Sequence, residues 1–311
     1  MNLQQLEYII AVDSQRHFAK AAEISFVTQA TLSMMIKKLE DELGIKIFDR
    51  TKQPVTPTRE GEEIIKRAKQ IIAEVTRLKD FSKEVKGEIT GELHLGVIPT
   101  LAPYLLPLFL RSFIRKYPQL KIFIKEMITE EVILRIKNGE LDMGLVATPL
   151  NESFILEHPL FYEEFFVYSS GKENLPNRKY LLPKQIDFKR LWLLEEGHCL
   201  RNQVLNFCEL KKEETDVENL HYEAGSIETL INLVDRYQGV TIIPHLALLT
   251  LRAPQKKNIR EFANPKPVRE ISIVVGKNFA RVKLLERLKA EIISKIPFES
   301  MLKNKKVVEI D

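Results

Sequence analysis

The first sixty residues place apolar side chains at intervals typical of helices. Near the start, the apolar positions that lie on one helical face are Leu3, Leu6, Ile9 and Ile10. A second, short helix is expected over residues 18–24, where small alanines permit close helix packing. A third helix is predicted to begin after Thr28, a favoured N-cap residue, and to end at Gly44. The segment therefore predicts three short helices in succession.

The third predicted helix separates an apolar stripe from a polar surface. Its apolar positions are Leu32, Ile36, Leu39 and Leu43. Two extended pieces over 45–50 and 55–58 follow, and they predict a small β-wing with basic residues near its tip. Polar groups near the start of such a helix suit a reader of the DNA major groove. The residues expected to contact DNA are Thr28, Gln29, Thr31, Ser33, Met34, Lys37, Arg50 and Lys52.

Residues 1–58 are thus predicted to form a winged helix-turn-helix. A plain three-helix bundle with a hairpin would share the helical pattern, and the basic cluster would then be a solvated loop. The net charge of +4 does not separate the two interpretations. The helical pattern by itself favours the plain bundle, so both interpretations stay open at this point.

Residues 59–87 predict one long helix, capped by Thr58 and ended by Gly87. At about 1.5 Å per residue it is about 42 Å long. Apolar residues step along it by four and three, at Ile64, Ala68, Ile71, Val75 and Leu78. This heptad pattern predicts a dimer seam, which would present two DNA readers to a palindromic site. The alternative is a helix packed on its own domain.

From residue 88 onward, strands and helices alternate. Buried strands are expected over 93–97, 120–125 and 141–146, separated by helices over 104–116 and 130–138, as in a parallel sheet covered by helices. The later predicted elements are 164–168, 191–194, a helix after Cys199, 227–235, 240–243, 271–275 and 280–293. A sheet begun early and completed late predicts two lobes joined by two crossover strands. The boundaries expected are 88–161 with 268–311 for lobe I, and 162–267 for lobe II.

The composition limits the cellular setting. Two cysteines are too few for a secreted disulfide scaffold. The first residues lack a basic leader, and no run of 18 apolar residues occurs. We therefore expect a cytoplasmic protein with no membrane partner, in which a disulfide would be transient or sensory.

The two cysteines, Cys199 and Cys208, lie in one short segment. His198 and Arg201 flank the first and are expected to favour its thiolate. A thiolate with one partner thiol in reach is suited to a reversible redox switch. Two inert buried cysteines are the alternative. A metal site is disfavoured because too few ligands are present, so no metal or cofactor is expected.

Three polar positions follow predicted strands, where ligands of open α/β sheets gather. Thr100 follows the first strand, Thr129 the second, and His198 with Cys199 the strand at 191–194. Each hydroxyl alone would be explained as a helix cap. Their convergence with a thiol predicts a site.

The N-terminal segment resembles the winged helix-turn-helix of LysR-type transcriptional regulators. The residues that carry the likeness are 18–22, 27–33, Ile36, Leu39, Glu40, Leu43, Gly44, Ile47, Phe48 and Arg50. The resemblance implies a dimerising linker helix and a two-lobed C-terminal domain similar to periplasmic binding proteins. The fold class expected is therefore α/β, with an N-terminal winged helix-turn-helix and a long linker helix.

The regulatory part looks like the hydrogen-peroxide-sensing OxyR branch of that family, on residues 95–100, 103–107 and 197–208. This likeness implies that peroxide oxidises Cys199 to a sulfenic acid, which Cys208 resolves as a disulfide. It also implies a peroxide pocket, with Thr100, Thr129, His198, Arg269 and, more weakly, His221. It further implies a homo-oligomeric activator, dimeric or tetrameric, that acts on promoter DNA with RNA polymerase and is not an enzyme.

Helix geometry adds a constraint on such a disulfide. If 200–208 are helical in the reduced protein, the nine-residue step separates the two Cα atoms by about 13 Å. A disulfide tolerates at most about 7 Å, so oxidation must unwind the helix. Two other functions remain open at this point. One is a LysR regulator of a small organic effector, with the cysteines as bystanders, and the other is a thiol peroxidase.

Overall fold

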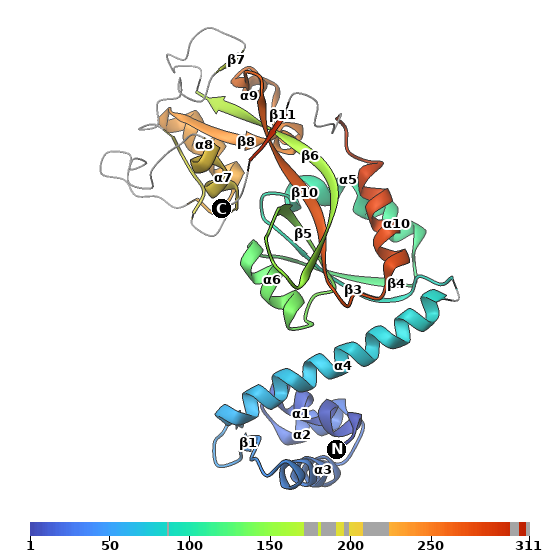
Figure 1. Ribbon diagram of the computed structural model, residues 1–311. Helices are drawn as coiled ribbons and strands as arrows, with labels where there is room; N and C mark the ends of the chain where they lie inside the picture. Colours follow the sequence, from blue (N-terminus) through green and yellow to red (C-terminus); the bar gives the residue numbers. More distant parts are fainter. Residues whose placement is uncertain are drawn as a thin grey trace. The chain divides into compact units, whose positions relative to one another are not determined.

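The computed structural model describes residues 1–85, 87–170, 180–181, 191–195, 199–207, 224–298 and 305–308 of the 311. It divides into two compact units. One comprises Met1–Glu88 with Asn138–Glu140, and the other Ile89–Lys137 with Leu141–Asp311. Figure 1 shows a mainly helical smaller unit, in blue, and a larger unit of strands covered by helices.

The smaller unit contains the three predicted helices and the wing. Its elements are α1 (Leu3–Gln15), α2 (Phe18–Ile24), α3 (Gln29–Leu43), β1 (Phe48–Asp49), β2 (Thr56–Pro57) and α4 (Arg59–Val85). The hydroxyl of Thr28 caps α3 by accepting from the amide of Thr31, and Gly44 ends that helix in the left-handed region. Both predictions are confirmed.

The wing strands are shorter than predicted, with two residues each. The amide of Val55 donates to the carbonyl of Arg16, and the amide of Thr58 donates to Ile47. Pro57 has no amide hydrogen to add to the ladder. The Val55 amide is therefore engaged outside the wing, and the pairing stops after Asp49. The bond from Thr58 to Ile47 continues the register of Phe48 with Pro57 at the other end.

Helix α4 divides the predicted heptad seam into two parts. Ala68 is buried in the core of the smaller unit, whereas Ile71 and Leu78 are 41% and 68% exposed. The first turns pack tightly, since a Cβ on Gly61 would lie 2.0 Å from the carbonyl oxygen of Ile47. The prediction of one continuous seam is therefore wrong for the first half of α4, which packs on its own domain. Its second half keeps an exposed apolar face.

The larger unit begins with the predicted alternation of strands and helices. Its first elements are β3 (Gly91–Val97), α5 (Ala102–Lys116), β4 (Leu120–Glu126), α6 (Thr129–Lys137) and β5 (Met143–Thr148). Strand β3 pairs in parallel with both β4 and β5, as expected for a sheet built through helical crossovers. Helix α6 lies close to this sheet, because a Cβ on Gly144 would meet Val132 Cγ1 at 2.4 Å. The close approach places Thr129, at the start of α6, beyond the carboxyl end of β4.

The remaining elements complete a second set of strands. They are β6 (Ile155–Ser169), β7 (Tyr180–Leu181), α7 (Cys199–Phe207), α8 (Ile227–Tyr237), β8 (Val240–Pro244), the 3-10 helix η4 (His245–Thr250), α9 (Ala253–Lys256), β9 (Ile259–Phe262), β10 (Lys266–Gly276), α10 (Val282–Ile293) and β11 (Lys305–Val307). The strand predicted over 191–194 consists of two isolated bridges, Leu191 to Val240 and Leu194 to Ala224. Strands β7, β9 and β11 were not predicted, because each is short.

Strands β6 and β10 are the two crossover strands. They pair antiparallel over most of their length, β10 also pairs with β5, and β6 also pairs with β8 and β9. Figure 1 shows the pair running from the sheet of β3–β5 to the strands around β8. The predicted α/β architecture, with two lobes joined by two crossovers, is confirmed.

Among the described residues, no helix is long and apolar enough to cross a membrane.

Candidate functional site

Cys199 is the first residue of α7 and is 9% exposed. Its Sγ lies 2.8 Å from Oγ1 of Thr129, the first residue of α6. The N-terminal ends of two helices thus bring a thiol and a hydroxyl into contact. Helix N-termini favour negative charge, so a thiolate at this point gains stability from the peptide dipoles.

Burial nevertheless raises the pKa of the Cys199 thiol, because the thiolate loses hydration. The hydrogen bond with Thr129 and the positive charge of Arg269 lower that pKa in part. Arg201 donates instead to the carbonyl of Leu194, at 2.8 Å. The prediction that Arg201 favours the thiolate is therefore wrong, and the net effect of the surroundings is to raise the pKa of Cys199.

Arg269 supplies the positive charge near this thiol. It is fully buried, and its Nη1 donates to Thr100 Oγ1 at 3.0 Å while Nη2 donates to the Thr100 carbonyl at 3.2 Å. Thr100 follows β3, and Arg269 lies on β10, so residues 169 apart in the chain share one contact. Nη1 carries two N–H groups, and Thr100 Oγ1 is the one acceptor found for them within the described segments.

A buried carboxylate, Glu163 of β6, neutralises Arg269. Glu163 Oε2 lies 2.8 Å from Arg269 Nε and 2.7 Å from Nη2. The other oxygen, Oε1, accepts from the amide of Leu246 at 2.7 Å. Both carboxylate oxygens are thus occupied, and the pair satisfies the requirement that buried charges be matched.

The structure brings four of the predicted site residues into one region: Cys199, Thr129, Thr100 and Arg269. His198, His221 and Cys208 lie outside the described residues. Glu163 was missed by the sequence analysis, because one acidic residue in an extended segment carries no signal of burial. Its pairing with Arg269 depends on the register of β6 and β10, in which the two are direct partners.

Gln203 is a second residue that was missed. It is fully buried on α7, one turn beyond Cys199, which places both on one helical face. Its Nε2 donates to the carbonyl of Val308 at 3.1 Å, and its Oε1 has no hydrogen-bond partner among the described residues. The spacing of four residues from Cys199 is the sequence signal that was available.

Within the described ranges, no cluster of three or more His, Cys, Asp or Glu residues could hold a metal ion. Cys199 is a free thiol.

The predicted DNA-contacting residues of α3 lie mainly on its exposed surface. Gln29, Thr31, Met34 and Lys37 are exposed, and Thr28 is exposed at the cap. Ser33 is only half-buried, and Lys52 of the wing is exposed beside Asp49, 3.5 Å away. The surface matches what a helix needs to present side chains to base edges.

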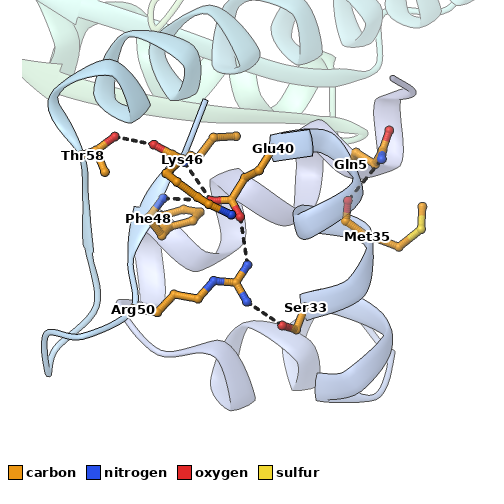
Figure 2. Close-up of polar contacts among 9 residues, drawn as sticks. Gln5, Ser33, Met35, Glu40, Lys46, Phe48, Arg50 and Thr58 are labelled. Carbon is orange, nitrogen blue, oxygen red and sulfur yellow. Dashed lines mark hydrogen bonds and ion pairs between the residues drawn. The ribbon is translucent and has the colours of Figure 1, made fainter. Parts of the chain in front are cut away.

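Arg50 is exposed, but its guanidinium is tied to neighbouring side chains (Figure 2). Its Nη1 donates to Ser33 Oγ at 2.9 Å, its Nη2 reaches Glu40 Oε2 at 3.2 Å, and its guanidinium lies 4.8 Å from the centre of the Phe18 ring. Ser33 and Arg50 therefore bind each other in the free protein. Their first role is to tie the wing to α3.

Glu40 is the anchor of this cluster. It is 2% exposed and accepts from the amides of Ile47 and Phe48 at 2.8 and 3.3 Å (Figure 2). Glu40 was noted only for the family likeness, and the structure gives it a buried role. A carboxylate that receives two backbone amides and a guanidinium fixes the start of the wing on the end of α3.

Comparison with known proteins agrees with both units. Residues 3–62 match the bacterial regulatory helix-turn-helix family of lysR type, and residues 86–295 match the LysR substrate binding domain. The chain is therefore a LysR-family transcription regulator, not an enzyme.

Within the LysR family the chain belongs to the OxyR branch. It is 37% identical to a hydrogen peroxide-inducible genes activator of Haemophilus influenzae, over 88% of this chain and 90% of that protein. It is 32% identical to the DNA-binding transcriptional dual regulator OxyR of Escherichia coli, over 88% and 89%. Among solved structures, full-length OxyR C199D of Pseudomonas aeruginosa is 32% identical with a TM-score of 0.75, over 95% of this chain and 99% of that one.

Proposed function

We propose that this protein senses hydrogen peroxide through Cys199 and converts its oxidation into altered promoter binding. The observation that carries the proposal is the contact of the Cys199 sulfur with Thr129, at a site that the buried charge of Arg269 also influences. The relatives described as hydrogen peroxide-inducible genes activators support the choice of oxidant.

The first chemical step is a two-electron oxidation of sulfur. A lone pair of Cys199 sulfur attacks one peroxide oxygen, the S–O bond forms and the O–O bond breaks. The departing oxygen takes up the thiol proton and leaves as water, so that one thiol and one peroxide give a sulfenic acid and water.

The neighbouring polar groups suit this step. The departing oxygen develops negative charge, and a preorganised donor stabilises that charge most strongly where water is excluded. The second N–H of Arg269 Nη1, for which the described residues offer no acceptor, is proposed as such a donor, and the hydroxyl of Thr129 stabilises the thiolate as the proton leaves. Thr100 holds the guanidinium by accepting from its Nη1 and Nη2 groups.

The second step forms the Cys199–Cys208 disulfide. The thiol of Cys208 attacks the sulfenic sulfur and expels the hydroxyl, which leaves as water with the Cys208 proton. Helix α7 runs from Cys199 to Phe207, so the cysteines begin about 13 Å apart along its axis if the helix continues one residue further. Because a disulfide tolerates about 7 Å, its formation unwinds α7.

Unwinding α7 would then alter how the DNA-binding units are presented. In this proposal residues 1–58 read palindromic promoter sites, 59–87 dimerise through the exposed face of α4, and 88–311 sense the oxidant. The regulator works in the cytoplasm as a homodimer or tetramer and activates RNA polymerase in its oxidised form. No metal or cofactor takes part.

The test is peroxide treatment of the full-length protein, followed by peptide mass spectrometry and promoter-binding measurements. The parent should gain a Cys199–Cys208 disulfide and change its DNA binding. A Cys208→Ser variant should stop at the Cys199 sulfenic acid, and a Cys199→Ser variant should not respond. A response that survives in Cys199→Ser would reject the proposal and favour an organic effector.

A further inference from the structure

The guanidinium of Arg269 is held by two groups that approach from different strands. Thr100, after β3, accepts from Nη1 and Nη2, while Glu163, on β6, lies against Nε and Nη2. Two fixed contacts on different edges of a planar group define its plane and its rotation within that plane. The direction of the remaining Nη1 N–H is therefore set by both partners.

The carboxylate of Glu163 is itself immobilised. Its Oε1 accepts from the Leu246 amide at the start of η4, which follows directly after β8. Its backbone faces Arg269 across the ladder, as its direct partner in the β6–β10 register. Glu163 therefore fixes the Arg269 guanidinium relative to β6, β10 and η4.

We infer that Glu163 is the positioning residue of the oxidation site, which orients Arg269 so that Nη1 faces the oxygen that reacts with Cys199. This inference rests on the proposed peroxide-sensing function. Glu163 makes no contact with the sulfur in the described structure. Its effect passes through Arg269.

A simpler explanation is that Glu163 only neutralises a buried cation. The two explanations differ in what geometry they require. Charge neutralisation needs a carboxylate nearby, whereas positioning needs a carboxylate that reaches both Arg269 and the Leu246 amide. Aspartate keeps the charge and is one methylene shorter, so it cannot make both contacts from the same backbone position.

The experiment compares peroxide oxidation of Cys199 with its alkylation by iodoacetamide, in the full-length protein. Both reactions use the thiolate, so the ratio of their rates cancels changes in thiol ionisation. Only the peroxide reaction needs a donor for a departing oxygen. Peptide mass spectrometry assigns each product to Cys199 rather than to Cys208.

The variants are Glu163→Gln, which removes the charge, and Glu163→Asp, which retains it. We expect the rate ratio to fall at least tenfold in both. The matched control is Glu164→Gln on the same strand, which removes the 3.0 Å ion pair with Lys266 and should keep the parental ratio. A parental ratio in Glu163→Asp would overturn the inference and leave neutralisation as the explanation.

Glu163→Asp decides the matter even if Glu163→Gln fails to fold, because it preserves the buried charge pair. Failure of the proposed function gives a different result. In that case the parent protein itself forms no sulfenic acid at Cys199. If the parent oxidises normally and Glu163→Asp keeps the parental rate ratio, only the positioning role is rejected.

Discussion

Cys199 and Thr129 meet at 2.8 Å, although 70 residues separate them in the chain. Each is the first residue of its helix, α7 and α6 respectively. The contact tunes the ionisation of the thiol, because a hydroxyl that donates to a thiolate stabilises the charged form.

Thr129→Val removes this hydrogen bond at nearly constant volume. The hydrogen bond lowers the pKa of Cys199, so its loss raises that pKa further. At a given pH below the pKa, the variant therefore contains less thiolate. A hydrogen bond to a charged group contributes about 1.5 kcal/mol, which corresponds to about one pH unit. The pH–rate profile of Cys199 alkylation should shift upward by about one unit. Thr229→Val in α8 is the control, and an unmoved Thr129→Val profile contradicts the assignment.

Oxidation should expose the amides of α7. The proposed disulfide would require α7 to unwind, because its nine residues from Cys199 to Phe207 extend over about 12 Å of helix and a disulfide tolerates at most about 7 Å between Cα atoms. Hydrogen exchange of this segment should accelerate at least tenfold after peroxide treatment, while α8 keeps its protection. Continued protection of α7, in protein whose disulfide is verified by mass spectrometry, would show that the bond forms without unwinding.

Glu40→Gln should weaken the wing. The substitution removes the charge that receives two backbone amides and Arg50, and about 1–3 kcal/mol of stability is expected to be lost. Thermal unfolding should show a lower midpoint for the N-terminal unit, and promoter affinity should fall. Asp41→Asn, at the exposed neighbouring position, should change neither property. Equal effects in the two variants would argue against a special role for the buried carboxylate.

Lys37→Ala tests the expected DNA surface. Lys37 is exposed on α3, where binding to a phosphate would make DNA affinity depend on salt. Removing one lysine–phosphate interaction reduces the slope of log affinity against log salt by about 0.9. Lys37→Ala should show this reduction on specific and unrelated DNA alike. Lys121→Ala, in the other unit, should not, and a parental slope for Lys37→Ala would place Lys37 away from the DNA backbone.

Local patterns were sufficient where a structure depends on neighbours in the chain. The helices over 3–15, 18–24 and 29–43 follow from apolar spacing and from caps such as Thr28. The strands of the first lobe follow from apolar runs separated by helices. The long helix was also predictable, but its division into a packed half and an exposed half was not. That division depends on which turns the other helices cover.

Several residues of the candidate site could be predicted from the sequence, but the buried groups that set its electrostatics could not. Thr100 and Thr129 were found from their places after strands, and Arg269 from the resemblance. Glu163 and Gln203 were not found, because neither the β6–β10 register nor the burial of α7 is visible in residue spacing.

The amino-acid sequence alone determined the order of most elements and the helix-turn-helix unit, and it predicted the thiol proposed for oxidation, since these depend on local periodicity and residue type. Tertiary structure decided the ionisation of Cys199 and the burial of Glu40. A pKa responds to hydration and to charges in space, so burial of the thiol outweighed the hydrogen bond of Thr129 and the charge of Arg269. Arg201 donates to the carbonyl of Leu194, whereas Arg269, from β10 late in the chain, donates to Thr100 at the site.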